Sequence, residues 1–266
     1  EIIVDGNNQV YKSQAGILYN KDMTRLLVCP AGKKGSVAVP ERIIFISGNA
    51  FNGCRHLTEI VANTNNSAYI SYDGVLYHKY IDDEGENAMS LLACPGEKEG
   101  AVQIPAEVTY IPYNAFIYCN NLTEFTVGQG NQIYSSIDGV LYRGKIKPYP
   151  QFLFQCPAKK EGNIVIPDET ISIDSYAFKG CSRLESITIP ELTSIPAGVF
   201  DDCMQNLHLY CVKGSKAESY AVKYGISYTA RKKSCGIEVD IEMWNPDDRY
   251  DADKITVGDN PFWLMP

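Results

Sequence analysis

Residues 177–190 read Ala-Phe-Lys-Gly-Cys-Ser-Arg-Leu-Glu-Ser-Ile-Thr-Ile-Pro, and their second half alternates apolar and polar side chains up to a proline. Alternation with period two predicts a strand with one buried face. Proline ends such a strand because it has no backbone N–H to give to a sheet. The same spacing of Ala-Phe, Cys and Leu occurs twice upstream, from Ala50 to Leu57 and from Ala115 to Leu122. The chain is therefore a repeat array, which overrules a domain count based on its 266 residues.

Three long copies keep one register without gaps over much of their length. Each has a Leu-Tyr pair followed downstream by a Cys-Pro pair, and from that cysteine a phenylalanine follows at +22, a second cysteine at +25 and a leucine at +28. A fourth, shorter unit repeats the phenylalanine after 22 residues. We interpret the recurring residues as structural: Cys29, Cys94, Cys156, Phe51, Phe116, Phe178, Phe200, Cys54, Cys119, Cys181, Cys203, Leu57, Leu122 and Leu184.

All variation in length falls between the Leu-Tyr pair and the Cys-Pro pair. The separations are 10 residues (19 to 29), 17 residues (77 to 94) and 14 residues (142 to 156). A site that accepts insertions while its flanks keep register is an exposed turn, because insertions in packed backbone would leave hydrogen-bonding groups without partners. Apolar residues on both sides predict that this turn is the tip of a β-hairpin.

The whole pattern, over about residues 2–228, resembles the BspA-like (Treponema-type) leucine-rich repeat family of bacterial surface proteins. Residues 180–190 (GCSRLESITIP) and 138–142 (DGVLY) carry this resemblance. It implies a mainly β repeat solenoid, a right-handed leucine-rich-repeat superhelix of short parallel strands with inserted β-hairpins. It also implies an extracellular or cell-surface location, use in attachment or recognition, and no catalytic residues. Residues 1–6 show no signal-peptide pattern, so the expected leader is not among these residues.

A short helix is expected to close the array. Ser215-Lys216-Ala217-Glu218 has the spacing of a capping box, and apolar residues then recur at helical intervals before Gly225. Such a helix would cover the apolar core that the last coil otherwise exposes. A surface helix that contacts another partner is the alternative, because it would show the same pattern. We therefore divide the chain into a solenoid, residues 1–230, with three long modules, one short coil and the capping helix, and a tail, residues 231–266. The tail is either an extra strand pair on the solenoid or the start of a further domain.

Charge and hydropathy exclude two classes of partner. Lys and Arg number 24 against 32 Asp and Glu, a net charge of −8, and no basic stripe stands out in the sequence. We therefore expect no binding of nucleic acid. No apolar run approaches the roughly 20 residues that a membrane-spanning helix needs, so we expect no membrane insertion of this segment.

Nine cysteines invite a disulfide or metal interpretation. The seven in repeat positions are interpreted as small buried apolar side chains. Cys211 and Cys235 lie outside those positions, and a disulfide between them in an oxidising compartment is the alternative to two free thiols. No Cys-x-x-Cys motif occurs. The acidic clusters at residues 82–86 and 247–253 do not fit the pattern of a calcium-binding loop. We expect no catalytic, cofactor-binding or metal-binding residues.

The hairpin tips differ in chemistry and are candidates for a recognition surface. The first is short and neutral, the second (78–90) is acidic, and the third (143–151) is basic and aromatic. Diversified loops on a regular scaffold suit recognition, although drift in a tolerant loop explains the variation as well. Tyrosines that do not recur in both other copies are further candidates. The candidate partner-binding residues are His78, Tyr80, Asp82, Asp83, Glu84, Tyr110, Tyr113, Tyr118, Lys145, Lys147 and Tyr149.

The sequence thus favours a non-enzymatic extracellular recognition or adhesion module that binds a protein partner through its strand face and hairpin tips. Two alternatives stay open. A carbohydrate-binding module would present exposed tyrosines in line along one face. A passive spacer of a larger surface protein would have featureless tips and no exposed apolar patch.

Overall fold

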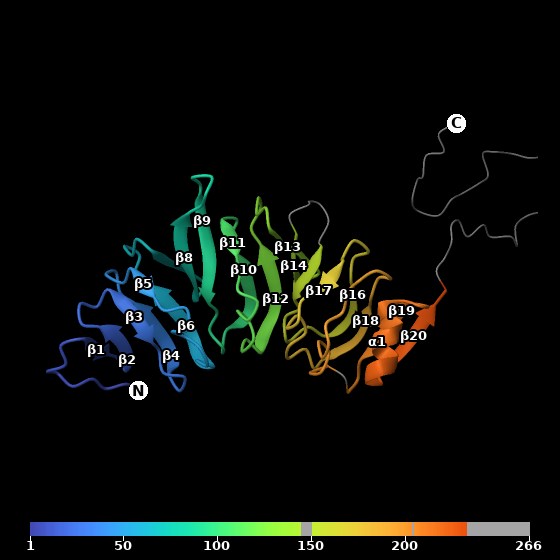
Figure 1. The fold of residues 1–266 in the computed structure, drawn as a ribbon, viewed down its shortest axis with the longest axis horizontal. Helices are drawn as coiled ribbons and strands as arrows, with labels where there is room; N and C mark the ends of the chain where they lie inside the picture. Colours follow the sequence, from blue (N-terminus) through green and yellow to red (C-terminus); the bar gives the residue numbers. More distant parts are fainter. Residues whose placement is uncertain (145–150, 204, 233–266) are drawn as a thin grey trace, which may run out of the picture.

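The computed structural model describes residues 1–144, 151–203 and 205–232. Its sheets follow one another along the long axis of the molecule, from β1–β3 at the N-terminal end to α1 and β20 at the other (Figure 1). This arrangement confirms the predicted mainly β solenoid with inserted hairpins and a short helix near its C-terminal end. Among the described residues, no helix is long and apolar enough to span a membrane.

Each long module begins with a three-stranded antiparallel meander, to which a short strand from later in the module adds in parallel. The predicted hairpins are the second and third strands of these meanders, which confirms their placement between the Leu-Tyr and Cys-Pro pairs. The three meander strands and, last in each set, the added parallel strand are β1 (Tyr11–Gln14), β2 (Ile17–Asn20), β3 (Arg25–Val28) and β5 (Phe45–Ile46); β7 (Tyr69–Tyr72), β8 (Val75–Ile81), β9 (Asn87–Ala93) and β11 (Val108–Tyr110); and β13 (Tyr134–Ile137), β14 (Val140–Arg143), β15 (Phe152–Gln155) and β17 (Ser172–Ile173).

The second structural feature of each module is a parallel sheet formed after the Cys-Pro turn. The alternating stretch within residues 177–190 and the equivalent stretches of the other two long modules form strands of these sheets, as the sequence predicts. Where a meander is inserted, the sheet stops after two strands; where the short coil follows directly, it continues to four. The sheets are β4 (Lys34–Val39) with β6 (His56–Ala62); β10 (Glu99–Ile104) with β12 (Asn121–Val127); and β16 (Gly162–Val165), β18 (Leu184–Thr188), β19 (His208–Val212) and β20 (Ser227–Arg231).

Glycine is required where these parallel sheets change register. The pairing shifts at Gly35, Gly100 and Gly162, whose φ angles are 74°, 75° and 73°. A positive φ costs an L-residue with a side chain more than it costs glycine, so the repeat keeps glycine at this bulge.

Two meander strands separate the cores of neighbouring modules. Leu76 of β8 packs into the core of the first module, while Val75 and Tyr77 pack into that of the second. In the same way, Leu141 of β14 belongs to the second core and its neighbours belong to the third. Strands buried on both faces explain why this part of the repeat is apolar at successive positions rather than alternating.

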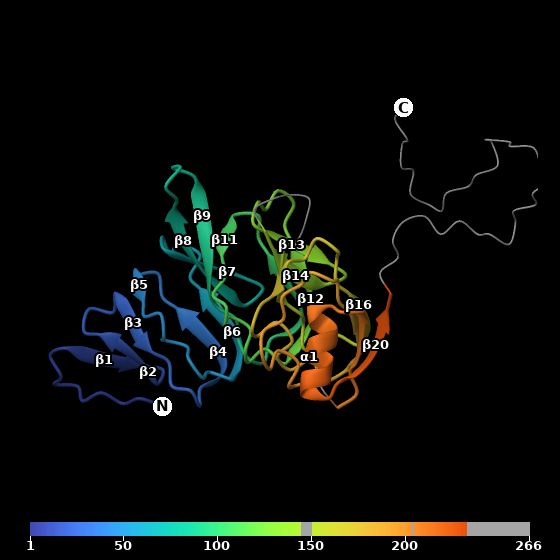
Figure 2. The same ribbon diagram turned by 45° about the vertical axis from the view of Figure 1, so that its right-hand side comes forward.

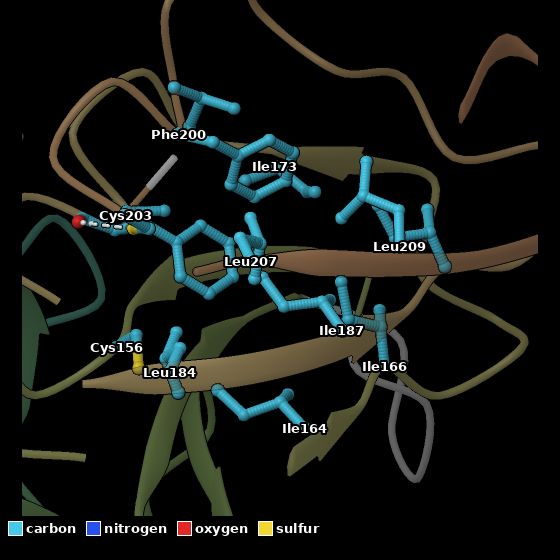
Figure 3. Packing of buried hydrophobic residues seen from close by; sticks show 14 of the residues in the cluster. Cys156, Ile164, Ile166, Ile173, Leu184, Ile187, Phe200, Cys203, Leu207 and Leu209 are labelled. Atoms are coloured by element: carbon cyan, nitrogen blue, oxygen red, sulfur yellow. Dashed lines mark hydrogen bonds between the residues drawn. The ribbon is translucent and has the colours of Figure 1, made fainter. Parts of the chain in front are cut away.

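In the last coils, apolar side chains stack from strand to strand. Ile164, Ile187 and Leu209 are register partners on β16, β18 and β19, and all three are buried (Figure 3). Phe178 and Phe200 are fully buried, with ring centroids 5.1 Å apart. Phe116, Leu57, Leu122 and Leu184 are buried as well, whereas Phe51 is only half-buried. Most of the recurring residues therefore belong to the buried core between coils, as expected for units that cannot bury their apolar faces alone.

Buried asparagines fix the turns that lead into the second and third meanders. The side-chain oxygen of Asn66 accepts hydrogen bonds from the N–H groups of Ala68 and Tyr69, at 2.9 and 2.7 Å. Its amide donates to the carbonyls of Pro40 and Ile43, at 2.8 and 2.9 Å. Asn131 makes the equivalent bonds in the second module. One side chain thus satisfies backbone groups of two neighbouring coils that would otherwise be buried without partners.

The predicted helix is α1 (Lys216–Tyr224), and it lies against β19 and β20 (Figure 2). Ser215 caps it by accepting from the Glu218 N–H at 3.2 Å, and the Glu218 carboxylate accepts from the Gly214 N–H at 2.6 Å. Gly225 ends it with a φ of 68°. Ala217, Tyr220 and Ala221 are buried, so one face of the helix packs on the core of the last coils. The chain continues beyond the helix, because β20 adds a parallel strand beside β19.

Candidate recognition surface

The second hairpin tip is held by one of the predicted carboxylates. The Asp82 side chain accepts hydrogen bonds from the N–H groups of Glu84 and Glu86, at 3.1 and 2.8 Å. Asp83 and Glu84 are exposed. Asp82 therefore shapes the turn, while its neighbours present negative charge to solvent. Lys145, Lys147 and Tyr149, predicted for the third tip, lie outside the described residues.

The base of the same hairpin is a half-buried aromatic stack. The His78 ring lies between Tyr69 and Tyr80, with centroid distances of 5.3 and 6.0 Å. The Tyr80 hydroxyl is hydrogen-bonded to Thr109, which attaches the hairpin to β11. These contacts place His78 and Tyr80 in the support of the tip, with only part of each side chain available to a partner.

We expect the stability of this hairpin to depend on pH through His78. Partial burial lowers the pKa of the His78 imidazole, so the unfolded chain binds a proton that the folded chain does not. The free energy of unfolding should therefore fall as the pH drops through about 6.5, the pKa of an unperturbed histidine. A His78→Gln variant should lose part of this dependence in urea unfolding measured between about pH 8 and pH 5. Equal pH dependence in both proteins would contradict the assignment.

The predicted tyrosines differ in exposure. Tyr110 is 55% exposed and Tyr113 is 68% exposed. Tyr113 stacks on Tyr176 of the next module, with ring centroids 6.0 Å apart and planes 17° apart. Tyr118 is half-buried beneath the Arg55 guanidinium, which lies 4.6 Å from its ring centroid. Tyr110 and Tyr113 are therefore the predicted tyrosines most open to a partner.

The structure adds exposed apolar residues that the sequence analysis missed. Ile44 and Ile171 are 62% and 51% exposed, and both lie 15 residues after the cysteine of their Cys-Pro pair. Phe45 and Tyr110 share the next position and are also exposed. We call these four residues, together with Tyr113 and Tyr176, the apolar row. The recurrence of large apolar residues at one repeat position was a usable signal, but recurrence alone does not distinguish an exposed position from a buried one.

A basic groove lies away from the hairpin tips, where the turns between coils meet. It has a volume of about 820 Å³ and is lined by cations from three turns, Arg55, Lys159, Lys179 and Arg183. Lys179 is paired with Asp202 at 3.0 Å, and Arg183 is paired with Glu161. Beside this groove, a Cβ at Gly96 would clash with the Arg55 carbonyl oxygen, so glycine is present where the other copies have alanine.

The described histidines and cysteines form no metal site. Within residues 1–144, 151–203 and 205–232, no three His, Cys, Asp or Glu side chains are grouped so that they could hold a metal ion. Six of the seven repeat cysteines are buried and Cys94 is half-buried. Cys211 is buried as a free thiol, and Cys235 lies outside the described residues.

Stacked parallel strands, bulge glycines and inserted hairpins together define a leucine-rich-repeat solenoid. The chain belongs to the BspA type leucine rich repeat family, whose model matches six copies over residues 33–74, 98–139 and 150–221. The resemblance inferred from the sequence is thus confirmed. No curated protein matches the chain.

Three solved structures are similar to this chain. They are the pneumococcal vaccine antigen PcpA (23% identity, TM-score 0.45), a leucine-rich repeat protein from Eubacterium ventriosum (19%, 0.43) and a leucine rich cell surface protein from Faecalibacterium prausnitzii (22%, 0.44). The matches cover 66%, 77% and 76% of this chain, and 38%, 65% and 56% of those chains. This chain therefore spans less than two thirds of each of them.

Proposed function

We propose that this chain is a recognition module at the cell surface or outside the cell, and that it binds a protein partner without catalysing a reaction. The observation that carries the proposal is the apolar row, in which Ile44 and Ile171 share one repeat position, Phe45 and Tyr110 share the next, and all are exposed. Exposed apolar residues that recur along one side of a soluble scaffold are typical of interaction surfaces. A passive spacer has no need of them.

The hairpin tip next to the apolar row supplies specificity. Tyr110 of β11 is the register partner of Ser90 on β9, so this member of the row lies beside the hairpin that carries Asp83 and Glu84. Apolar contact area bordered by negative charge suits a protein surface with an apolar centre and a basic rim. We therefore expect affinity to come from the tyrosines, and the association rate and salt dependence to come from the carboxylates.

A binding screen tests the proposal directly. The probes are purified collagen, fibronectin and laminin, together with a glycan array, and the proteins are the parent and the double variant Tyr110→Ser with Tyr113→Ser. Loss of two central aromatic contacts should weaken protein binding at least about tenfold, which corresponds to about 1.4 kcal/mol. Tyr228→Ser is the matched control, because Tyr228 is an exposed tyrosine on β20, away from the row.

The same screen contains the outcomes that count against the proposal. Equal binding by the parent and the double variant would show that Tyr110 and Tyr113 of the apolar row are not part of the binding site. A parent that binds no probe at all would favour the spacer.

Reversal of charge by Asp83→Lys with Glu84→Lys should slow association at low salt; Asp82 is left unchanged because it holds the turn.

A carbohydrate ligand is the second candidate function, and the Tyr113–Tyr176 pair is the observation that favours it. Two stacked, solvent-exposed rings offer a flat apolar face with hydroxyl groups at its border. Binding to the glycan array but to none of the proteins, with loss in Tyr113→Ser, would establish this function in place of protein recognition.

A further inference from the structure

Each long module brings two cysteines together from distant parts of its sequence. In the first module, the sulfurs of Cys29 and Cys54 both approach the carbonyl oxygen of Pro30, at 4.0 and 3.6 Å. The Cys54 thiol also lies 3.4 Å from the carbonyl oxygen of Cys29. The Cys29 N–H donates to the Ala50 carbonyl at 2.7 Å, so the Cys-Pro turn and the Ala-Phe turn are fixed against each other.

The same arrangement recurs in the other two long modules. The Cys94 and Cys119 sulfurs share the Pro95 carbonyl, at 3.9 and 3.4 Å. The Cys156 and Cys181 sulfurs share the Pro157 carbonyl, at 3.7 and 3.6 Å. In all three modules, the thiol of the second cysteine also lies 3.4 to 3.8 Å from the carbonyl oxygen of the first. Packing alone requires only small apolar side chains here, so the pairing of two thiols in every long module calls for another explanation.

We propose that these pairs are three disulfide sites, and that Cys29 with Cys54, Cys94 with Cys119 and Cys156 with Cys181 each close to one bridge in an oxidising compartment. The proposal goes beyond partner recognition and does not depend on which partner is bound. Both sulfurs of each pair lie within 4.0 Å of one carbonyl oxygen, so bridging calls for a local approach of the two sulfurs.

The chemistry balances with an external disulfide as the oxidant. One cysteine of a pair loses its proton, and its thiolate attacks a sulfur of the oxidant, which gives a mixed disulfide and releases one thiol. The second cysteine then attacks the mixed disulfide, forms the intramolecular bridge and releases the other thiol. Per bridge, two cysteine thiols are oxidised and one molecule of the external disulfide is reduced to two thiols.

The short fourth coil provides an internal control. Cys203 occupies the same repeat position as Cys54, Cys119 and Cys181, but its sulfur lies 3.5 Å from the carbonyl oxygen of Phe178. Phe178 stands 25 residues before Cys203, where the long modules have the first cysteine of the pair. Cys203 should therefore stay a free thiol under conditions that oxidise the three pairs.

The test uses the full chain, refolded from the reduced and denatured state in a buffer of reduced and oxidised glutathione. Refolding removes the difficulty that buried thiols in the folded protein react slowly. The protein is then denatured, alkylated and measured by mass spectrometry before and after digestion with trypsin. We expect three bridges, each recorded as the loss of two hydrogen atoms and two alkylation sites. Tryptic peptides 26–33 and 43–55 should be joined, as should 80–98 with 99–143 and 146–159 with 180–183.

Variants separate a specific bridge from general oxidation. Cys54→Ser should release Cys29 for alkylation and leave the other two bridges intact, while Cys203→Ser should leave all three. Closing 24 intervening residues restricts the unfolded chain, so the urea midpoint of the oxidised protein should exceed that of the reduced protein. Recovery of all nine cysteines as alkylated thiols, or a bridge from Cys181 to Cys203, would overturn the proposal.

Discussion

Replacing Phe178 with alanine should lower the free energy of unfolding by about 3 to 5 kcal/mol, the range for removal of a large ring from a close-packed core. The Phe178 side chain is 0% exposed and lies 5.1 Å from the Phe200 ring. Its loss therefore removes apolar burial and leaves a cavity between the third module and the short coil. The measurement is urea unfolding followed by circular dichroism.

Phe51→Ala is the matched control, because Phe51 occupies the same repeat position but is only half-buried. Less of the Phe51 apolar surface is removed from water when the protein folds. Truncation to alanine should therefore lower the free energy of unfolding clearly less than at Phe178. Because solenoids unfold in parts, the midpoint and the steepness of each transition are compared before a free energy is derived. A larger loss for Phe51→Ala than for Phe178→Ala would show that repeat position, and not burial, determines the contribution.

Replacing Asn66 with alanine should destabilise the protein by about 2 to 4 kcal/mol, more than a surface substitution does. Asn66 is 2% exposed and satisfies the N–H groups of Ala68 and Tyr69 and the carbonyls of Pro40 and Ile43. Alanine leaves these backbone groups buried without partners, and each such group costs about 1 to 3 kcal/mol unless water enters. Thermal unfolding of the variant and the parent measures the effect.

Two further substitutions test the mechanism at this position. Asn65→Ala, at the exposed neighbouring residue, should change stability by no more than about 0.5 kcal/mol. Asn66→Asp keeps the acceptor for the two N–H groups but has no amide to give to the carbonyls, so it should be destabilising as well. Wild-type stability of Asn66→Asp would mean that the bonds to the carbonyls contribute nothing.

Much of the fold follows from the sequence, because residues that recur at a fixed spacing indicate equivalent packed positions in successive coils. The offsets from Cys29, Cys94 and Cys156 place the strands, the hairpins and the turns, and the structure has them there. The capping box before α1 is also local, since Ser215 and Glu218 are one helical turn apart. Such features depend on neighbours along the chain or on equivalent positions of adjacent coils, and both are visible in one sequence.

The candidate surface was less predictable. Tyr110 and Tyr113 were selected because they do not recur, and the structure exposes both. Ile44 and Ile171 were overlooked, because an apolar residue at a repeat position is usually part of the core. Asn66 and Asn131 were overlooked for the opposite reason: a polar residue in a turn is usually exposed, and only the hydrogen bonds to the preceding coil show that these two are structural.

The sequence by itself determined the architecture of this protein, because each coil imposes the same backbone path and therefore the same spacing of apolar residues, glycines and prolines. The tertiary structure alone decided which side chains meet across the array. The cations of the basic groove come from three separate turns, and the paired thiols are 25 residues apart. Such contacts depend on how far each coil rises and on where the inserted meanders separate the coils. These distances are properties of the stacked backbone and have no counterpart in the order of the residues.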